Sequence, residues 1–507
     1  MAIPVCPMNR GRPRETASRV RARLARVLLF AGFAACSADS AVRNEDGGSP
    51  DVATAKDVGA AASATSPSPT RVTVDLSKLR EISPMLYGQN YFNWIPEWGG
   101  QVLAVKDLVI PLGLNLLRAG GTPMDTSDPV CVGLGDIDTF VDYAADVGAA
   151  PYFQIPFVAM RDAAGTLVPS TSASAAALVA YMNVTRGYGV RYFCIGNEPD
   201  IYEDQGRTIA GESTEGYTPE RFCTAFADYV AAMKAVDPTI QILAPELSWQ
   251  YHAWLPPFLR DCGHLVDVVT VHRYPFDSTE DTAEAVYDDG PALRANLRYL
   301  RDLLVKAGYG DKPLAITEAH VTWDTDPAKP QLSGAPGSIA SGLWVADSLG
   351  IAMEEGLWSL AFWSLSEEWT VGFIDGRTPK PEYYTMLLVG QHFRSAIASV
   401  AGAPAGVSVY AGRNAGATPI LLINKTDKTS DISIAIVGAP VPVAGTTLSV
   451  PPFSAVVAEI PDQGPLSAWI YGEAQLESGS GPQPLVTGSP AAIDAGTSTD
   501  VAAAGGS

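Results

Sequence analysis

A regular alternation of short apolar runs and longer amphipathic segments occupies the middle of this 507-residue chain. The apolar runs are typical of strands buried on both faces, and the segments between them have helical spacing. The stretch at 218–236 is the clearest helix, because Pro219 lies at its start and Asp237-Pro238 at its end. We expect eight strands: Leu86–Tyr91, Asn115–Arg118, Tyr152–Ile155, Tyr192–Ile195, Gln241–Ala244, Val266–Val271, Leu314–Thr317 and Leu360–Trp363. Eight βα repeats predict a closed (β/α)8 TIM barrel over residues 80–392.

Beyond residue 384 the helical rhythm gives way to β-rich runs. They are Val407–Tyr410, Pro419–Ile423, Ile432–Val437, Thr446–Ser449 and Ala455–Ile460. These runs predict a C-terminal β-sandwich domain over residues 393–460. Residues 71–79 alternate like a half-buried strand before the first barrel strand, so we expect them to join that domain. The composition of residues 461–507 predicts a low-complexity, mostly disordered tail, with Trp469–Tyr471 as a docked exception.

The first 35 residues have the pattern of an export signal. Seven arginines and one acid precede an apolar run from Val27 to Ala35, and Cys36 follows. Phe33-Ala34-Ala35-Cys36 resembles a bacterial lipobox, although Phe33 stands where Leu is usual. We therefore expect lipidation at Cys36, with simple cleavage near Ala35 as the alternative. Residues 36–70 are rich in Ala, Ser, Asp, Gly and Pro and predict a disordered linker.

The net negative charge of the chain limits the classes of partner that we expect. The whole chain carries −21, and removal of residues 1–35 leaves 27 basic against 54 acidic residues, or −27. Such acidity argues against nucleic acid as a partner and against long-range attraction of a polyanion. The apolar run of nine residues at 27–35 is too short to span a bilayer, so a lipid anchor is the only membrane attachment expected.

Four cysteines follow Cys36, at positions 131, 194, 223 and 262. An oxidising compartment allows one or two disulfides, and the three full pairings stay open. Their spacing suits no metal site. Cys194 lies inside an apolar strand, where a small buried side chain is the expected role.

Two glutamates follow strands of the expected barrel. Glu198 comes three residues after the run Tyr192–Ile195, where Gly196 and Pro199 end the strand. Glu318 ends the run Leu314–Thr317, and the 120 positions between the two glutamates hold three βα units of ordinary size. Carboxyl ends of parallel strands form the active face of such barrels.

The motifs IGNEPD and AITEAH, in this order and spacing, resemble the fourth and seventh strands of the clan of retaining TIM-barrel glycoside hydrolases. Residues 82–90 (ISPMLYGQN), 117–121 (LRAGG) and 271–275 (VHRYP) narrow the resemblance to families 39, 44, 51 and 79, without a choice among the four. The resemblance covers roughly residues 71–460.

The resemblance implies a set of roles. Glu198 would be the acid/base and Glu318 the nucleophile, with carboxyl oxygens about 5 Å apart for retention of configuration. Asn197 would bind the sugar 2-hydroxyl, and Arg118 would orient and ionise the nucleophile. A capping role for Asn197 and a structural ion pair for Arg118 are the alternatives. The mechanism needs no metal and no organic cofactor.

Other candidates depend on their strand positions. His272 and Tyr274 are two residues apart and face the same way, so we expect one of them to contact Glu318 or the sugar. Glu246 and Tyr87 are weaker candidates for substrate contact. Aromatic candidates for sugar platforms are Trp363 at the end of the eighth strand and Trp94, Trp249, Trp323 and Trp369 on loops.

The resemblance predicts an exported enzyme that hydrolyses O-glycosidic bonds of a poly- or oligosaccharide. A surface carbohydrate-binding lipoprotein without catalysis is the first alternative, and the presence of both glutamates argues against it. A transglycosidase is the second, because it uses the same residues with a different acceptor. The sugar, the linkage and the choice between endo and exo action stay open.

Overall fold

The computed structural model describes residues 69–91, 102–128, 132–162, 164–324, 329–366, 371–439 and 443–485. The predicted export signal, Cys36 and nearly all of the predicted linker lie outside these residues. Among the helices within the described ranges, none is long and apolar enough to cross a membrane.

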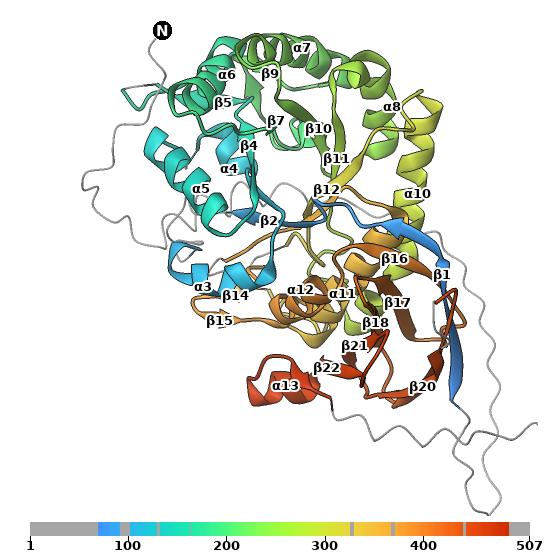
Figure 1. Ribbon diagram of the computed structural model, residues 1–507. Coiled ribbons are helices and arrows are strands. Elements are labelled where there is room, and N and C mark those ends of the chain that lie inside the picture. Colours follow the sequence, from blue (N-terminus) through green and yellow to red (C-terminus); the bar gives the residue numbers. More distant parts are fainter. Residues whose placement is uncertain are drawn as a thin grey trace, which may run out of the picture.

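Eight parallel strands close into a barrel with helices around it (Figure 1). In barrel order they are β2 (Tyr87–Tyr91), β3 (Leu116–Ala119), β4 (Ala150–Ile155), β7 (Tyr192–Ile195), β10 (Gln241–Leu247), β11 (Val268–Arg273), β12 (Leu314–Ala319) and β13 (Ser359–Phe362). Each lies within three residues of its predicted bounds. The (β/α)8 barrel is therefore confirmed.

The helices follow the strands as βα units. They are α3 (Lys106–Val109), α4 (Thr122–Thr126), α5 (Leu134–Asp146), α6 (Ser172–Val179), α7 (Pro219–Val236), α8 (Tyr251–Cys262), α9 (Ala283–Asp288), α10 (Gly290–Lys306), α11 (Ile339–Glu355) and α12 (Pro381–His392). Helix α7 begins as predicted, because Pro219 occupies its first turn and the Thr218 hydroxyl accepts a hydrogen bond from the Arg221 N–H. Short hairpins on the loops are β5 (Ala159–Arg161) with β6 (Leu167–Pro169), β8 (Thr208–Ile209) with β9 (Glu212–Ser213), and β14 (Ile374–Asp375) with β15 (Thr378–Pro379).

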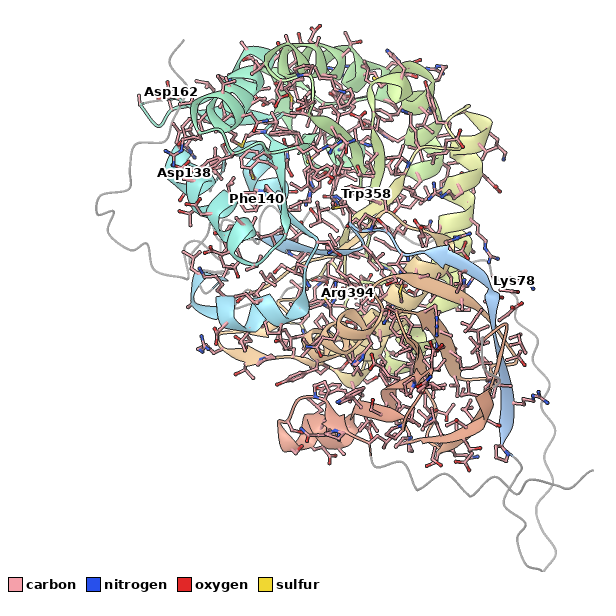
Figure 2. All side chains as sticks on the ribbon, viewed as in Figure 1. Lys78, Asp138, Phe140, Asp162, Trp358 and Arg394 are labelled. Atoms are coloured by element: carbon pink, nitrogen blue, oxygen red, sulfur yellow. A yellow bond between two sulfur atoms is a disulfide. The ribbon has the colours of Figure 1, made fainter. Side chains whose placement is uncertain are left out.

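The barrel interior has an apolar layer below a polar one. The apolar layer consists of Leu116, Tyr152, Tyr192, Cys194, Leu243, Val268 and Ala315. The ring of Trp358, labelled in Figure 2, meets the edge of the Tyr192 ring at 5.3 Å near the amino-terminal end of the strands. Because side chains two positions apart face the same way, Arg118 lies above Leu116 and Thr317 above Ala315. The polar layer is the candidate site.

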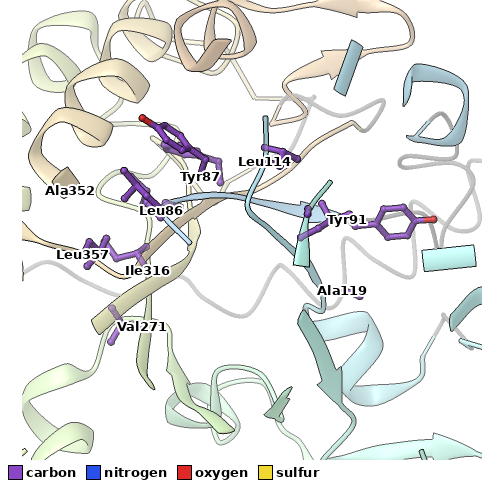
Figure 3. Close-up of a cluster of buried hydrophobic side chains, with 14 of the residues drawn as sticks. Leu86, Tyr87, Tyr91, Leu114, Ala119, Val271, Ile316, Ala352 and Leu357 are labelled. Carbon is purple, nitrogen blue, oxygen red and sulfur yellow. The ribbon is translucent and has the colours of Figure 1, made fainter. Parts of the chain in front are cut away.

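The outer faces of the strands pack against the surrounding helices. Figure 3 shows part of this main core, in which Leu86, Val271 and Ile316 lie close to Ala352 and Leu357 from α11 and the turn after it. The core continues around the barrel and includes buried side chains from each of the helices α5 to α12. Burial on both faces explains why the barrel strands are apolar without alternation.

The β-rich domain is one curled sheet of nine strands, in the order β20, β19, β1, β16, β17, β18, β21, β22, β23. Its strands are β1 (Thr70–Glu81), β16 (Ala396–Ala401), β17 (Val407–Arg413), β18 (Ala417–Asn424), β19 (Ser430–Val437), β20 (Val443–Val450), β21 (Ser454–Pro461), β22 (Ser467–Gly472) and β23 (Gln483–Pro484). As predicted, the N-terminal strand β1 joins this sheet, antiparallel to β16 and parallel to β19.

The predicted disorder after residue 461 is wrong for the first part of that segment. Strand β22 pairs with β21 through Trp469–Tyr471, and α13 (Glu473–Ser478) follows it. The ring centroids of Trp469 and His392 are 4.6 Å apart, so the docked exception extends to a whole strand. Residues after 485 lie outside the described part of the chain.

The sheet packs on the barrel through α11 and α12. Along β18, Leu421 and Ile423 face the main core, whereas Ile420 and Leu422 face a second core inside the curled sheet. Helix α11 is buried on all sides from Ile339 to Met353 because it lies between barrel and sheet.

Cys223 on α7 and Cys262 at the end of α8 form a disulfide. This selects one pair from the alternatives that the sequence leaves open. Cys194 is a buried free thiol in β7, as expected for a small core side chain. Cys131 lies outside the described residues.

Candidate active site

Two irregularities in the barrel ladder determine which side chains meet at the carboxyl ends of the strands. The pairing of β10 with β11 steps from Pro245 opposite Thr270 to Leu247 opposite Val271, so Glu246 is left out of register. Its N–H bonds instead to the Thr270 hydroxyl at 3.0 Å. Such bulges redirect a side chain at the rim of a barrel.

The second irregularity lies between β11 and β12. Val271 pairs with Ile316, and the next pair is His272 with Glu318, so Thr317 is the extra residue. Because of this bulge, His272 and Glu318 lie side by side on neighbouring strands. Both are buried, and their side chains meet inside the barrel.

Glu198 reaches the same place from the turn after β7. Its backbone is left-handed, with φ 53°, and its N–H bonds to the carbonyl oxygen of Glu246 at 3.0 Å. Gly196, two residues earlier, is also left-handed, and a Cβ there would lie 2.7 Å from the Tyr202 hydroxyl oxygen. The left-handed region is costly for a non-glycine residue, by roughly 1 kcal/mol or more, so the surrounding contacts fix this turn.

The two candidate catalytic carboxyls face each other at short range. One oxygen of Glu198 and one of Glu318 lie within 4.8 Å of each other, and the Nδ1 atom of His272 lies within the same distance of both. Glu318 is held on both oxygens: Arg118 Nη1 donates to Oε1 at 2.5 Å, and the Tyr274 hydroxyl donates to Oε2 at 3.0 Å. The side chain of Glu198 is 14% exposed and that of Glu318 7%, so both reach the surface of the site.

The environments of these carboxyls differ. Burial raises the pKa of Glu198, the neighbouring charge of Glu318 adds to the rise, and His272 opposes it. Glu318 instead accepts charge-assisted and neutral hydrogen bonds, from the Arg118 guanidinium at Oε1 and from the Tyr274 hydroxyl at Oε2. The two carboxyls therefore differ in their partners: His272 faces Glu198, and Arg118 and Tyr274 hold Glu318.

Arg118 is completely buried at the centre of the polar layer. Besides Glu318, its Nη2 lies 2.9 Å from Glu246 Oε2 and donates to Asn197 Oδ1 at 2.9 Å. Asn90 and Gln154 accept further hydrogen bonds from the guanidinium, at 2.9 and 3.2 Å. Arg118 therefore orients the nucleophile candidate and does not reach the surface where a sugar would lie.

His272 lies among three carboxylates. Its Nδ1 is 2.9 Å from Glu198 Oε1 and 3.6 Å from Glu318 Oε2, and its Nε2 is 3.1 Å from Glu246 Oε2. Burial alone would lower the pKa of His272, but the three carboxylates outweigh it and raise the pKa to about 10. Both His272 and Tyr274 therefore contact the catalytic candidates, where one contact was expected.

The structure contradicts two of the expected substrate contacts. Tyr87 points out of the barrel: its ring lies under the Arg394 guanidinium, and its hydroxyl donates to the Phe393 carbonyl at 2.5 Å. Glu246 is wholly buried beneath the site, with its carboxylate surrounded by protein donors. Neither side chain is accessible to a sugar.

The tryptophans differ in position. Trp363 is half-buried beside Gly121, where a Cβ would lie 2.7 Å from the indole ring. Trp249, on the loop after β10, is 62% exposed, and Trp323, after β12, is 37% exposed. Trp94 and Trp369 lie outside the described residues.

Sequence reasoning missed four members of the polar layer. Three are the side chains of Asn90, Gln154 and Thr317, and the fourth is the hydroxyl of Tyr152, whose ring belongs to the apolar layer below. Asn90 supports the site from β2 by donating to the Thr317 and Phe362 carbonyls, and Gln154 also accepts the Gly121 N–H. Two-residue spacing on strands already assigned to the barrel was the available signal, because Gln154 follows Tyr152 and both face inward.

Glu198, His272 and Glu318 are also the only group in the described part of the chain whose donor atoms are close enough to share a metal ion. A cation there would lie near the Arg118 guanidinium, whose Nη1 already donates to Glu318 Oε1 at 2.5 Å. That positive charge, and the protonation of His272, both oppose metal binding. The arrangement therefore suits acid/base and nucleophilic chemistry by the side chains themselves.

Comparison with known proteins gives matches at the level of structure. Neither protein-family models nor curated protein sequences match the chain. An α-L-arabinofuranosidase from Thermotoga maritima superposes with a TM-score of 0.60 at 16% identity, covering 77% of this chain and 100% of that one. A family 44 xyloglucanase from Paenibacillus polymyxa gives 0.60 at 15% identity, covering 78% and 100%.

A family 51 α-L-arabinofuranosidase from Thermotoga petrophila gives a TM-score of 0.57 at 18% identity, covering 77% of this chain and 100% of that one. At such identities the likeness establishes the fold. The described chain thus has the barrel-and-sheet architecture of the glycoside hydrolases in families 44 and 51, two of the four families whose motifs it resembles.

Proposed function

We propose that this protein is a glycoside hydrolase that acts by a retaining double displacement, with Glu318 as nucleophile and Glu198 as acid/base. The observation that carries the proposal is the approach of the two carboxyls to within 4.8 Å. Retaining enzymes separate these groups by about 5–5.5 Å, whereas inverting enzymes leave about 6.5–9.5 Å for a water molecule.

The first step follows from the two environments. Glu318, oriented by Arg118 and Tyr274, attacks the anomeric carbon as the glycosidic C–O bond breaks. Glu198, whose pKa is raised by burial, gives its proton to the leaving oxygen. A glycosyl ester of Glu318 results.

In the second step, Glu198 is ionised and accepts a proton from water. The water oxygen attacks the anomeric carbon, and the bond to Glu318 breaks with its electron pair returning to the carboxylate. Asn197 bonds to Arg118 through Oδ1 and donates one N–H to the Thr122 hydroxyl. Its second N–H is available to the sugar 2-hydroxyl, the role that the motif resemblance implies.

The loop aromatic residues support a sugar substrate that extends beyond one ring. Trp249 is highly exposed, yet its backbone is fixed: the N–H groups of Ser248, Trp249 and Gln250 all donate to the Asp200 carboxylate at 3.0–3.1 Å. Asp200 lies two residues after Glu198, so the tryptophan is held on the leaving-group side. Trp363 remains the proposed platform for the sugar that is attacked.

The test is a screen of purified protein against aryl arabinofuranosides, xylosides, glucosides and glucuronides, followed by the matching oligosaccharides. The names of the structural neighbours place the first three classes at the head of the screen. Hydrolysis that is lost in Glu318→Gln supports the proposal. Sugar binding without turnover by the wild type would favour the carbohydrate-binding alternative, and products longer than the substrate would favour a transglycosidase.

We also propose export and a lipid anchor at Cys36. The basic start, the apolar run and Ala34-Ala35-Cys36 support this. Metabolic labelling with a fatty-acid analogue should tag the wild type and not Cys36→Ala. Equal labelling of the two proteins would refute the anchor.

A further inference from the structure

Glu246 is a third carboxylate, directly beneath the two that carry the proposed reaction. It is wholly buried, so it cannot touch a sugar. Its backbone is left-handed, with φ 58°, and it occupies the bulge of β10. A buried charge at a strained position persists only where the surroundings fix it, and such positions concentrate at functional sites.

The contacts of Glu246 show that it is ionised. Its Oε2 atom lies 2.9 Å from Arg118 Nη2 and 3.1 Å from His272 Nε2, and it accepts a hydrogen bond from Thr317 at 3.0 Å. Its Oε1 accepts from the Tyr152 hydroxyl at 2.6 Å. Burial alone would raise the pKa of Glu246, but Arg118 and His272 hold it at about 2.

Few other charges face Glu246. The titratable groups around it are Arg118 on β3, Tyr152 on β4, Cys194 on β7 and His272 on β11. Burial raises the pKa of Tyr152 and of Cys194, so both are neutral near pH 7. Within the described residues, Arg118 and His272 are therefore the counter-charges of Glu246.

The geometry of His272 places a carboxyl group against each ring nitrogen. Nε2 faces Glu246, and Nδ1 faces both Glu198 and Glu318. An Nε2 without a proton would direct its lone pair at the Glu246 carboxylate 3.1 Å away, and an Nδ1 without one would face the Glu318 carboxylate at 3.6 Å. With both protons present, each nitrogen donates.

We propose that Glu246 is a positioning residue that keeps His272 as an imidazolium throughout the reaction, so that its Nδ1–H stabilises whichever catalytic carboxyl is ionised. This inference rests on the proposed function. In the free enzyme, Glu318 is the ionised partner. In the glycosyl-enzyme, Glu318 is an ester and Glu198, which has given its proton to the leaving group, is ionised.

Charge balance supports the assignment. In the free enzyme, Arg118 and His272 carry positive charge, Glu246 and Glu318 carry negative charge, and Glu198 is protonated, so the buried site is neutral. After the first step the negative charge has moved from Glu318 to Glu198, and the site is neutral again. His272 keeps both of its protons in each half of the cycle. Without Glu246, an imidazolium would leave an uncompensated buried positive charge.

The direct test is ¹⁵N NMR of histidine-labelled protein, with His272→Gln to assign the signal. At pH 7 the wild type should show both His272 nitrogens protonated, and Glu246→Gln should show a neutral ring. Glu382→Gln is the matched control, because Glu382 is equally buried but bonds to the Gly337 N–H away from this network. A neutral His272 in the wild type overturns the proposal, and this result does not depend on the variant's folding or on activity.

The kinetic test uses an activated aryl glycoside. In folded Glu246→Gln, the pKa of His272 should be lower than in the wild type, so that the ring is neutral at pH 8 and still protonated at pH 5.5. Relative to the wild type, kcat/KM should therefore fall at least about tenfold more at pH 8 than at pH 5.5. Glu382→Gln should keep the wild-type profile. A pH-independent loss in Glu246→Gln would indicate a purely structural role and overturn the proposal. If the wild type cleaves no glycoside, the proposed function fails, while the NMR result still decides the state of His272.

Discussion

Replacement of Arg118 by methionine should remove a large part of the stability of the barrel. Arg118 is fully buried and compensates the charges of Glu318 and Glu246, at 2.5 and 2.9 Å. Methionine fills much of the same volume without a charge. Removal of one partner from a buried ion pair typically costs about 3–5 kcal/mol, because the remaining charge is left uncompensated.

The pKa of Glu246 gives a second estimate of the stability that is lost in Arg118→Met. It lies at about 2 in the folded protein, against an ordinary value of 4.5. A carboxyl with a lowered folded pKa contributes stability that is present above the unfolded pKa and is lost as the pH falls through the folded pKa. The contribution is about 3 kcal/mol at pH 7 and about 1 kcal/mol at pH 3.

Equilibrium urea unfolding of the wild type and Arg118→Met, at pH 7 and pH 3, measures the effect. We expect a loss of about 3 kcal/mol at pH 7 that shrinks by about 2 kcal/mol at pH 3. The control is Arg413→Met, which breaks a surface pair with Asp462 and should change stability little. A loss below about 1 kcal/mol at pH 7, or one that is equal at both pH values, would refute the reasoning.

Three further predictions concern catalysis, substrate and acid stability. Glu318→Gln should be inactive on every substrate, whereas Glu198→Ala should still cleave activated aryl glycosides and turn over faster with azide, giving a glycosyl azide of retained configuration; an inverted azide from Glu198→Ala would exchange the two assignments. Trp249→Ala should lower kcat/KM for oligosaccharides about tenfold and leave aryl glycosides unchanged, and equal loss on both would exclude a leaving-group subsite. His320 is fully buried, and burial together with Lys380 lowers its pKa to about 3, so the free energy of unfolding should fall by about 2 kcal/mol between pH 8 and pH 5 as the unfolded chain takes up a proton. Urea unfolding of His320→Gln should show a smaller fall over this range, and a fall equal to that of the wild type would assign the pH dependence to other groups.

The sequence predicts the barrel well because each strand and helix carries a local signal. The helix at 218–236 has its own cap and stop, and Glu198 and Glu318 each follow an apolar run that ends at a recognisable turn. Strand order in a βα repeat then brings the two glutamates to one face without further information. The placement of strand β1 in the C-terminal sheet was predicted for a similar reason, because the alternation of residues 71–79 is that of a half-buried strand and not of a barrel strand.

The errors concern relations between strands. A strand buried on both faces does not show which face is the interior, so Tyr87 was assigned to the site although it points outward. Bulges depend on the register between two strands, and the sequence of one strand does not show them. The bulge in β10 turns Glu246 beneath the site, and the bulge in β12 places Glu318 beside His272. The contacts of Arg118 with Glu246 and Glu318 therefore could not be predicted from the sequence alone.

The configuration of the first product tests the central claim most directly. Once a substrate is identified, ¹H NMR of the anomeric proton in the first minutes of hydrolysis distinguishes the two stereochemical outcomes, before mutarotation mixes them. The approach of Glu198 and Glu318 to within 4.8 Å predicts a product with the anomeric configuration of the substrate. A product of the opposite configuration would contradict the double displacement and the roles assigned to both glutamates.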